Sequence, residues 1–568
     1  MNMRRDGGPE PEDTAELGAP LDLLLTRAAG GLRHRVGPST STAKLLVGLA
    51  ARPRPVARRA GALAAELGRV ALGVSDVAPG PRDRRFADPA WSTNPMLRRT
   101  LQAYLATSSA AREIVEQAGL DPHDATRVRA GVSNLIDALA PSNNPVLNPE
   151  ALRAIVDTAG THFLRGARNL VRDMAEPPRV PRMVEPDAFV VGETVAATPG
   201  QVVARTPQYE LIRYTPTTTS VREYPLVIVP PVINKYYVVD MAPGRSLVEY
   251  LVGEGHQVFV MSWRNPDVRH ASWGLDVYGT AVLEALTTAR SLTRAPRALV
   301  HAFCSGGIIA SMALAHLAAG GGLDTVAGLG LSVAVLDQQD TGLTGELLTP
   351  AAAEAAVRAS AARGYLDGRA LAEVFAWLRP NDLVWNYWVS SYLLGRSPAP
   401  FDVLFWNADT TRMTAALHRG FVEIARDNAL TRPGGATLLG TPVDLAAVTV
   451  DSYVTAGVTD HICPWQACYR STDLLGGSSR FVLSSAGHVA SIVNPPSSTK
   501  ASFWTAAETP VAAEDWHRDA ERVQGSWWPD LSRWLHARSG DEVDAPTESG
   551  NAEYPVLEPA PGTYVHTT

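Results

Sequence analysis

The spacing of apolar residues changes along the chain from a helical period to an alternating one. In the first third, apolar side chains recur at three- and four-residue intervals, which predicts amphipathic helices. These helices cover residues 96–118, 124–139 and 149–174. After Pro177, Pro178 and Pro181 the apolar residues alternate with polar ones, which is typical of half-buried strands. The first such strands are predicted at residues 189–191, 201–204 and 209–212.

Beyond residue 224 short apolar runs alternate with helical segments. Predicted strands cover residues 224–229, 256–261, 298–303 and 481–483, and predicted helices cover residues 246–253 and 279–291. An alternation of this kind favours a parallel sheet with helices packed against it. The pattern therefore predicts an α/β fold that follows a helical domain.

Breaks in the pattern divide the chain into four parts. We expect a disordered N-terminus at residues 1–20, a helical N-terminal domain at 21–180, an α/β domain at 181–540 and a disordered, acidic tail at 541–568. Within the α/β domain, an insertion at about 334–431 is rich in Trp, Tyr and Phe. Because it is too long for a simple crossover, we predict a cap or lid over a cleft.

Composition and charge narrow the class of protein. A chain of 568 residues is too long for one compact core, and its net charge of -7 argues against nucleic acid as a partner. Its three cysteines, Cys304, Cys463 and Cys468, fit a reducing compartment rather than a disulfide framework. Neither a signal-peptide pattern nor an apolar run of about twenty residues is present. We therefore expect a cytoplasmic protein without a transmembrane segment.

The segment from residue 21 to residue 72 is rich in arginine. We expect Pro38, Pro53 and Pro55 to break it into short helices. One interpretation of this segment is a solvated basic face. The other is an amphipathic surface that contacts lipid or a hydrophobic particle. The sequence leaves both interpretations open.

Candidate chemistry begins where the apolar run at 298–303 ends. A cysteine, a serine and two glycines at 304–307 follow this run and lead into an Ala-rich helical segment. This strand–turn–helix order is that of a nucleophile elbow, with Cys304 as the nucleophile and glycines that allow a sharp turn. Ala302 stands where such elbows usually have glycine. An alternative interpretation is a buried structural cysteine at a strand end.

An acid and a histidine follow in the order that an α/β-hydrolase arrangement requires. Asp460 lies in a loop after an apolar strand, and His488 lies in a loop after the strand at 481–483. Because such loops meet at one edge of a parallel sheet, we predict that His488 takes the proton of the thiol. Asp460 is predicted to orient the imidazole or to act as a base towards another substrate group. His461 is a rival base, and either residue taken alone also fits a structural role.

An oxyanion hole needs two donors. The backbone N–H of Ser305 supplies one, and the loop after the strand at 224–229 is the expected source of the second. Neither a phosphate-binding glycine loop nor a complete set of metal ligands accompanies the site, so we expect no cofactor and no metal. A thiol that accepts an acyl group from a thioester forms another thioester, which keeps the group activated. The choice of cysteine therefore favours acyl transfer over hydrolysis.

Several segments resemble the long, single-subunit polyhydroxyalkanoate synthases, and the likeness extends from about residue 85 to residue 538. They are residues 230–237 (PPVINKYY), 262–267 (SWRNPD), 379–387 (RPNDLVWNY), 401–407 (FDVLFWN), 460–465 (DHICPW) and 487–488 (GH) with 494–496 (NPP). The resemblance implies an α/β-hydrolase catalytic domain behind a helical N-terminal domain. It also implies that Cys304 carries the acyl chain as a thioester and that His488 is its general base.

The same resemblance implies the remaining roles. Asp460 is expected to assist the 3-hydroxyl group of the substrate, and the backbones of Ser305 and Val238 are expected to form the oxyanion hole. The implied reaction polymerises (R)-3-hydroxyacyl-CoA into a polyester and releases CoA. The implied partners are this substrate, the growing chain, the surface of a polyester granule and a second copy in a homodimer. The preferred acyl chain length stays open.

Two other functions are compatible with the same residues. A thioesterase or polyester depolymerase of the α/β-hydrolase fold would use water to resolve its acyl-enzyme. A granule-coat protein without catalysis would need only the amphipathic helices near the N-terminus. The ordered set of Cys304, Asp460 and His488 favours an enzyme over the coat protein.

Overall fold

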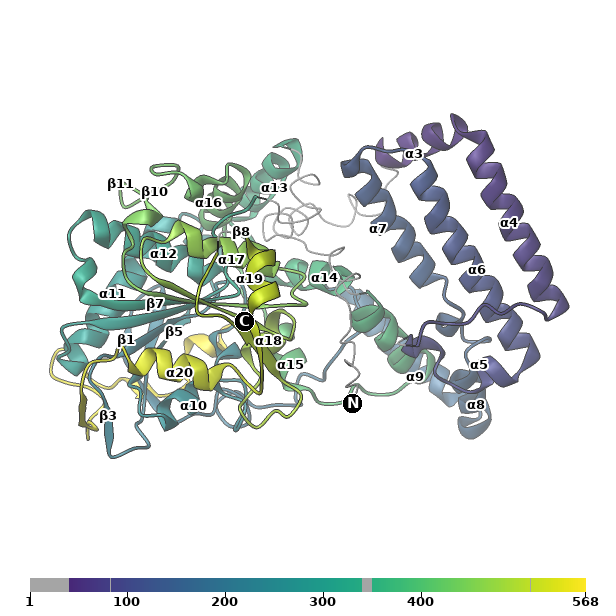
Figure 1. Ribbon diagram of the computed structural model, residues 1–568. Coiled ribbons are helices and arrows are strands. Elements are labelled where there is room, and N and C mark those ends of the chain that lie inside the picture. The colour runs from purple at the N-terminus through teal and green to yellow at the C-terminus, as the bar shows by residue number, and fades with distance from the viewer. Residues whose placement is uncertain (1–39, 82, 340–349, 379, 511) are drawn as a thin grey trace, which may run out of the picture. The chain divides into compact units, whose positions relative to one another are not determined.

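The computed structural model describes residues 40–81, 83–339, 350–378, 380–510 and 512–568 (Figure 1). These residues form two compact units. The helical unit comprises the described residues of 31–185 and 372–400, and the α/β unit comprises those of 186–371 and 401–568. The segment predicted to be disordered at 1–20 lies outside the described residues. Residues 372–400, predicted as part of an insertion in the α/β domain, belong instead to the helical unit.

Amphipathic helices build the helical unit. They are α3 (Thr40–Ala50), α4 (Pro53–Leu72), α5 (Ala90–Thr93), α6 (Pro95–Gln117), α7 (Pro122–Ala138), α8 (Pro149–Thr158) and α9 (Thr161–Ala175). The side chains of Asn94, Asp121 and Asn148 cap α6, α7 and α8, and each precedes a proline at a position that needs no backbone donor. The helix predicted at 149–174 is two helices, because Ala159 and Gly160 adopt left-handed conformations between α8 and α9.

Proline does not break α4. The predicted break is present at Pro53, because α3 ends at Ala50 and α4 begins at Pro53. Pro53 and Pro55 both lie in the first turn of α4, where backbone N–H groups have no partner within the helix, so no further break follows and α4 extends over 20 residues. Arg59 of this helix forms an ion pair with Glu113 of α6. Arg69 pairs with Glu66 and Asp76. Ion pairs of this kind fit the solvated basic face, and the contact with a hydrophobic particle stays a prediction.

The middle of the predicted insertion belongs to the helical unit. It contains α14 (Gly368–Leu378), which begins in the α/β unit, and π-helical turns at Asn381–Trp385 and Trp388–Leu393. Ala376 and Val384 pack against Val180. The hydroxyl of Tyr392 donates a 3.0 Å hydrogen bond to Asp173 of α9. These contacts join segments two hundred residues apart, which a reading along the chain does not reveal.

An eleven-stranded sheet organises the α/β unit, in the order β15-β14-β13-β12-β7-β6-β4-β5-β2-β1-β17. The parallel core consists of β4 (Leu226–Val229), β5 (Val258–Trp263), β6 (Ala298–Phe303), β7 (Val326–Ser332), β12 (Ser452–Gly457) and β13 (Ser479–Ser484). The antiparallel edge strands are β1 (Gly200–Arg205), β2 (Tyr209–Tyr214), β14 (Ser502–Thr505), β15 (Glu521–Gln524) and β17 (Glu558–Pro559). The predicted α/β fold is confirmed.

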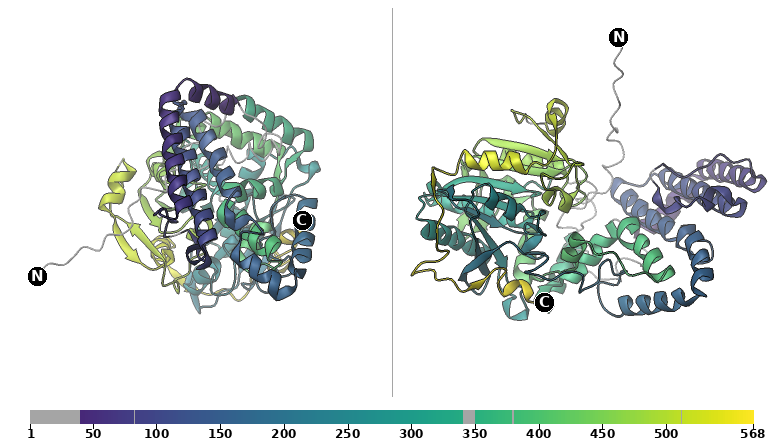
Figure 2. Two further views of the ribbon diagram at one scale, coloured as in Figure 1. Left: turned by 90° about the vertical axis from the view of Figure 1, so that its right-hand side faces the viewer. Right: turned by 90° about the horizontal axis from the view of Figure 1, so that it is seen from below.

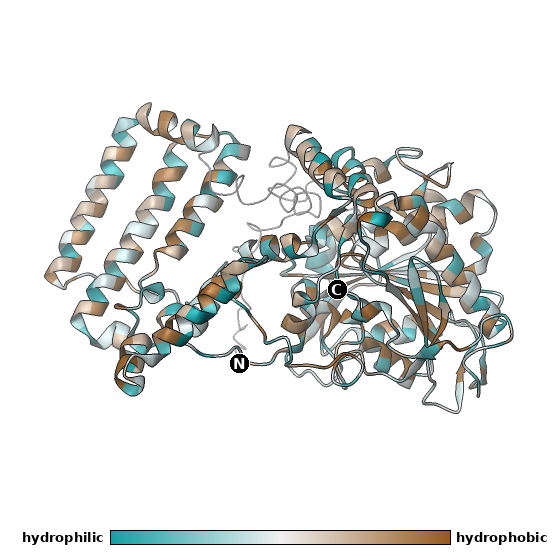
Figure 3. Cartoon of the chain, turned by 180° about the vertical axis from the view of Figure 1, so that it is seen from behind, coloured by the Kyte–Doolittle hydropathy of each residue, from teal (hydrophilic) through white to brown (hydrophobic). Residues whose placement is uncertain are grey.

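Helices cover both faces of this sheet (Figures 1 and 2). On one face lie α11 (Leu275–Thr293), α12 (Ser305–Ala319) and α17 (Trp465–Leu474), and on the other lie α10 (Leu247–Gly253) and α20 (Trp528–His536). Figure 3 shows apolar residues along the central strands, whose side chains are buried between these helices. Within the described ranges, no helix has both the length and the apolar character that crossing a bilayer demands.

Further helices and short strands belong to the α/β unit. They are α13 (Pro350–Arg363), α15 (Asp402–Ala408), α16 (Ala415–Arg426), α18 (His488–Ile492) and α19 (Ala513–Asp519), with β3 (Ser220–Arg222), β8 (Tyr365–Leu366), β9 (Met413–Thr414), β10 (Thr437–Leu438), β11 (Thr441–Pro442) and β16 (Glu542–Asp544). The strand predicted at 189–191 is wrong, since only an isolated bridge from Val191 to Val195 forms there.

The tail at 541–568, predicted to be disordered, is ordered. Strand β16 pairs with β3, and β17 extends the sheet beside β1. The buried carboxylate of Glu210 accepts hydrogen bonds from the backbone N–H groups of Thr563 and Tyr564. The Nζ of Lys235 donates to the carbonyl oxygen of Thr567 at 2.5 Å. Composition alone missed this docking because its partners lie more than three hundred residues away in the sequence.

Candidate active site

The turn between β6 and α12 has the geometry of a nucleophile elbow. Strand β6 ends at Phe303 and α12 begins at Ser305, so that Cys304 alone makes the turn, with φ 50° and ψ -122°. A positive φ is strained for a residue other than glycine and persists only where its surroundings hold it. One contact that fixes this conformation is the hydrogen bond from the backbone N–H of Cys304 to the carbonyl oxygen of Ser332, at 2.9 Å. The predicted strand–turn–helix is confirmed.

The two glycines after Cys304 are required by close packing. A Cβ on Gly306 would lie 2.6 Å from the carbonyl oxygen of Pro230. A Cβ on Gly307 would lie 2.6 Å from the Cβ of Ala334. Glycine at 306 therefore lets α12 start against the loop that follows β4, and glycine at 307 lets it pack against the segment that follows β7. Ala302, which stands where glycine is usual, is fully buried within β6.

The acid and the histidine come from the loops after two neighbouring parallel strands. Asp460 follows β12, and His488 follows β13 at the start of α18. One carboxylate oxygen of Asp460 lies 2.7 Å from Nδ1 of His488. The other oxygen accepts hydrogen bonds from the backbone N–H groups of Ile462 and Cys463, at 2.8 and 2.9 Å. The carboxylate is thus held by its own loop and fixes the orientation of the His488 ring.

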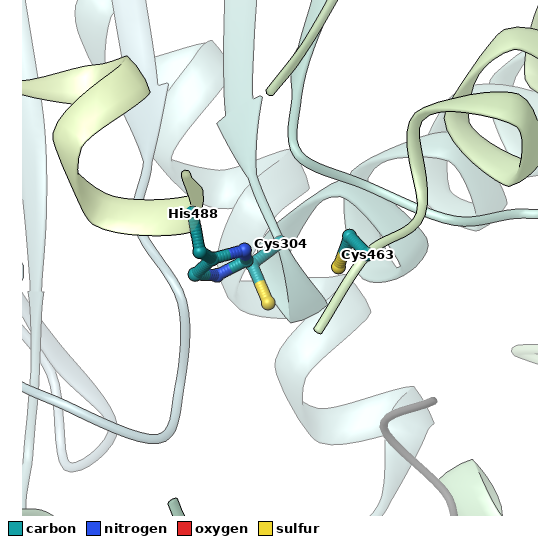
Figure 4. A group of neighbouring side chains, drawn as sticks. All are labelled: Cys304, Cys463 and His488. Carbon is teal, nitrogen blue, oxygen red and sulfur yellow. The ribbon is translucent and has the colours of Figure 1, made fainter. Parts of the chain in front are cut away.

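The ring of His488 reaches the sulfur of Cys304. Sγ of Cys304, Sγ of Cys463 and a ring nitrogen of His488 all lie within 4.8 Å of one another (Figure 4). Because Nδ1 of His488 is engaged by Asp460, the nitrogen available to the thiol is Nε2. The structure therefore brings together the three predicted residues of the acid–base–nucleophile set. The role of each residue stays a prediction at this point.

The electrostatics of the pair suit proton transfer from the thiol. Burial acts to lower the pKa of His488, but the carboxylate of Asp460 outweighs it and the pKa rises from 6.5 to about 10. Hydrogen bonding with Cys463, followed by burial, raises the pKa of the Cys304 thiol well above its ordinary value, while His488 acts in the opposite direction. Asp460 thus stabilises the imidazolium that forms when His488 takes the proton of Cys304.

The loop after β4 packs directly against the elbow. The hydroxyl oxygen of Ser305 accepts a 3.1 Å hydrogen bond from the backbone N–H of Val232. Further along this loop, Tyr236–Val238 forms a single buried 3₁₀ turn. The hydroxyl of Tyr237 donates a 2.9 Å hydrogen bond to Asp409. These contacts hold the loop that carries Val238 beside the start of α12, while the oxyanion donors at Ser305 and Val238 stay a prediction.

Cys463 is the member of this cluster that sequence reasoning missed. The spacing of Cys463 and Cys468 does not match that of a zinc finger and so indicates no metal site. Its position three residues after Asp460 could have indicated that it lies near the site, because the rest of that loop must lie near the acid. Cys468 differs, since it lies in α17, is fully buried and directs its Sγ to the carbonyl oxygen of Cys463 at 3.7 Å.

Comparisons with known proteins indicate the family of this chain. The family model described as the N-terminus of poly-beta-hydroxybutyrate polymerase (PhaC) matches residues 82–251, and the model described as alpha/beta hydrolase fold matches residues 225–495. Poly(3-hydroxyalkanoate) polymerase 2 of Ectopseudomonas oleovorans is 45% identical over 506 residues, which cover 89% of this chain and 90% of that protein.

A second relative supports the same assignment. The poly(3-hydroxyalkanoate) polymerase subunit PhaC of Cupriavidus necator is 40% identical over 496 residues, which cover 86% of this chain and 84% of that protein. The two family models together match residues 82–495, a range that includes the candidate site. The chain belongs to the family of poly(3-hydroxyalkanoate) polymerases and has the α/β-hydrolase fold.

Proposed function

We propose that this protein polymerises (R)-3-hydroxyacyl-CoA into a polyester and that Cys304 carries the acyl chain as a thioester. The observation that carries the proposal is the convergence of the Cys304 sulfur, the His488 ring and the Asp460 carboxylate at one edge of the sheet. The names of the relatives support the substrate class.

Acylation of Cys304 follows from this geometry. Nε2 of His488 accepts the thiol proton, and the sulfur attacks the carbonyl carbon of the acyl-CoA. The carbon–sulfur bond to CoA then breaks, and His488 returns the proton to the departing CoA thiolate. The backbone N–H groups of Ser305 and Val238 are the proposed donors to the oxyanion that forms between these two steps.

Elongation needs a hydroxyl nucleophile instead of a thiol. The 3-hydroxyl of an incoming hydroxyacyl-CoA attacks the thioester carbonyl of the chain on Cys304, the Cys304 thiolate leaves, and a base accepts the hydroxyl proton. Asp460 is the proposed source of that assistance, acting through His488, which it contacts at 2.7 Å. The lengthened chain is then held as a CoA thioester, and acylation of Cys304 by that thioester releases one CoA. Each cycle therefore lengthens the polyester by one unit.

The location of the enzyme is a separate part of the proposal. We propose that the protein works in the cytoplasm at the surface of polyester granules and as a homodimer. Exposed apolar side chains on α8 and α9 support a hydrophobic contact, since Val156, Leu164 and Val171 are more than two-thirds exposed. Granule binding by the full chain, measured by sedimentation with preformed polyester particles, tests this part.

One assay separates the proposal from the two alternatives. Purified protein is given (R)-3-hydroxybutyryl-CoA while free CoA and turbidity are recorded together. Release of CoA with insoluble polymer supports the polymerase. Release of CoA with only free acid indicates a thioesterase or depolymerase, and binding to granules without CoA release indicates a coat protein.

A further inference from the structure

We propose that Cys304, Cys463 and His488 form a binding site for a thiophilic d¹⁰ cation, for which Zn²⁺ is the probe, and that its occupation stops acyl transfer. Binding of the cation does not depend on the proposed function. Inhibition does, because it requires Cys304 and His488 to be the groups that perform the chemistry.

The geometry of the three ligand atoms carries this proposal. Two cysteine sulfurs and one imidazole nitrogen lie within 4.8 Å of one another, and Figure 4 shows the three side chains facing a common space. In a tetrahedral zinc site with bonds of about 2.3 Å to sulfur, two ligand atoms lie about 3.8 Å apart. The cluster therefore needs to contract by about 1 Å at most, which is within the reach of small side-chain rotations.

The donor set is the one that zinc prefers. Thiolate and imidazole are soft and borderline ligands that select zinc over magnesium or calcium. Asp460 bonds Nδ1 of His488 and so directs the lone pair of Nε2 towards the sulfurs, as outer carboxylates do for metal-bound histidines. Three protein ligands leave a fourth position, which water can fill.

The Cys463 thiol forms and breaks no bond in the proposed acyl transfer, although it hydrogen-bonds Cys304. Its backbone N–H supports Asp460, and any residue other than proline would supply that contact. Its side chain is buried beside the reactive sulfur, with only 4% of the residue exposed. A second nucleophilic group held at this position converts a catalytic Cys–His pair into a chelating site.

Occupation of the site blocks the reaction by removing both reactants. A cation bound to the Cys304 sulfur and to His488 Nε2 withdraws the nucleophile and the base together. Binding displaces the thiol protons into solvent, and a chelator reverses it when the ligands are protonated again. A disulfide between Cys304 and Cys463 would instead require an oxidant and would be reversed by a reductant.

The first test measures metal binding on the full chain without reference to activity. The chelator-treated, reduced protein is titrated with Co²⁺, whose sulfur-to-metal absorption reports the number of bound thiolates, and with Zn²⁺ in competition with a coloured chelator. We expect one site per chain. Cys463→Ser is expected to weaken Zn²⁺ binding by more than about tenfold and to reduce the charge-transfer band. Cys468→Ser is the matched control and is expected to bind as wild type.

The second test measures inhibition within each variant against its own zinc-free rate of CoA release. Wild type and Cys468→Ser are expected to lose activity with Zn²⁺ and to regain it with a chelator, whereas Cys463→Ser is expected to need at least about tenfold more Zn²⁺. Equal Zn²⁺ affinity in Cys463→Ser and wild type overturns the proposal. Recovery with reductant alone also overturns it and indicates a disulfide. If the serine variant does not fold, Cys463→Val is measured in the same two tests.

The outcomes distinguish this inference from the proposed function. If Cys463→Ser binds Zn²⁺ more weakly and wild type produces only free acid, the metal site is supported and the polymerase is rejected. Polymer formation with unaltered Zn²⁺ affinity in Cys463→Ser keeps the polymerase and rejects the metal site.

Discussion

The sheet edge and the surface of the helical unit differ in which side chains they bury. The sheet edge buries a charged side chain, whereas the helical unit exposes apolar ones. At the sheet edge, Asp460 is buried, and its two carboxylate oxygens are engaged by His488 and by backbone N–H groups. In the helical unit, charged side chains such as Arg59 and Glu113 pair at the surface while Val156 and Leu164 face outwards. Buried polar groups must be held in one geometry, whereas surface pairs contribute little to stability. Substitutions at the sheet edge should therefore have large effects, and those on the helical surface small ones.

Removal of the nucleophile is expected to have the largest effect. Cys304→Ala removes the only group proposed to form the thioester, so CoA release should fall by at least about 10³-fold. The melting curve recorded by circular dichroism should change little, because only one sulfur atom is lost. Substantial polymer formation by this variant would show that another residue carries the chain.

Loss of the carboxylate beside His488 should separate the two halves of the cycle. Asp460→Asn is expected to form the first acyl-enzyme but to slow elongation by about 10²–10⁴-fold, the range for a lost acid–base contribution. Rapid-quench measurement of the first CoA released, followed by steady-state release, distinguishes the two steps. Polymer of normal length at the normal rate would remove the assigned role of Asp460.

A pair of glycine substitutions compares the two regions directly. In Gly306→Ala the new Cβ lies 2.6 Å from the carbonyl oxygen of Pro230, so the folded state should lose about 1–3 kcal/mol and the rate should fall. In Gly61→Ala, within α4, the new Cβ meets nothing within 4 Å, and the helix should gain about 0.5–1 kcal/mol. Denaturant unfolding measures both changes, and equal signs would contradict the comparison.

The charge on His488 should make stability depend on pH. Its pKa is about 10 in the folded protein against an ordinary value of 6.5, so the folded state binds this proton more tightly than the unfolded state. The contribution is complete below about pH 6.5 and is lost as the pH rises through about 10. The free energy of unfolding of wild type minus that of His488→Gln is expected to fall by about 1.5–3 kcal/mol over this window. A difference that stays constant with pH would refute the assignment of the proton.

The smallest effect is expected on the helical surface. Arg59 and Glu113 are each 42% exposed in their side chains, so solvent screens the ion pair. Arg59→Ala should change the free energy of unfolding by no more than about 0.5 kcal/mol. A loss above about 2 kcal/mol would show that the helical surface is as constrained as the sheet edge.

The sequence predicted what depends on local pattern. The strand that ends at Phe303, the elbow at Cys304 and the loops of Asp460 and His488 were predictable because buried strands and glycine turns have local signatures. Long-range contacts had no such signature. The packing of Val384 against Val180 and the docking of Tyr564 against Glu210 join distant segments, and Cys463 enters the site only through the path of its loop.

Peptide mapping can show directly which residue carries the acyl group. The protein is mixed with one equivalent of (R)-3-hydroxybutyryl-CoA, quenched in acid, digested and mapped by mass spectrometry. The account predicts a 3-hydroxybutyryl thioester on the peptide that contains Cys304 and no such adduct after Cys304→Ala. A thioester found on Cys463 or Cys468, with the Cys304 peptide unmodified, would contradict it.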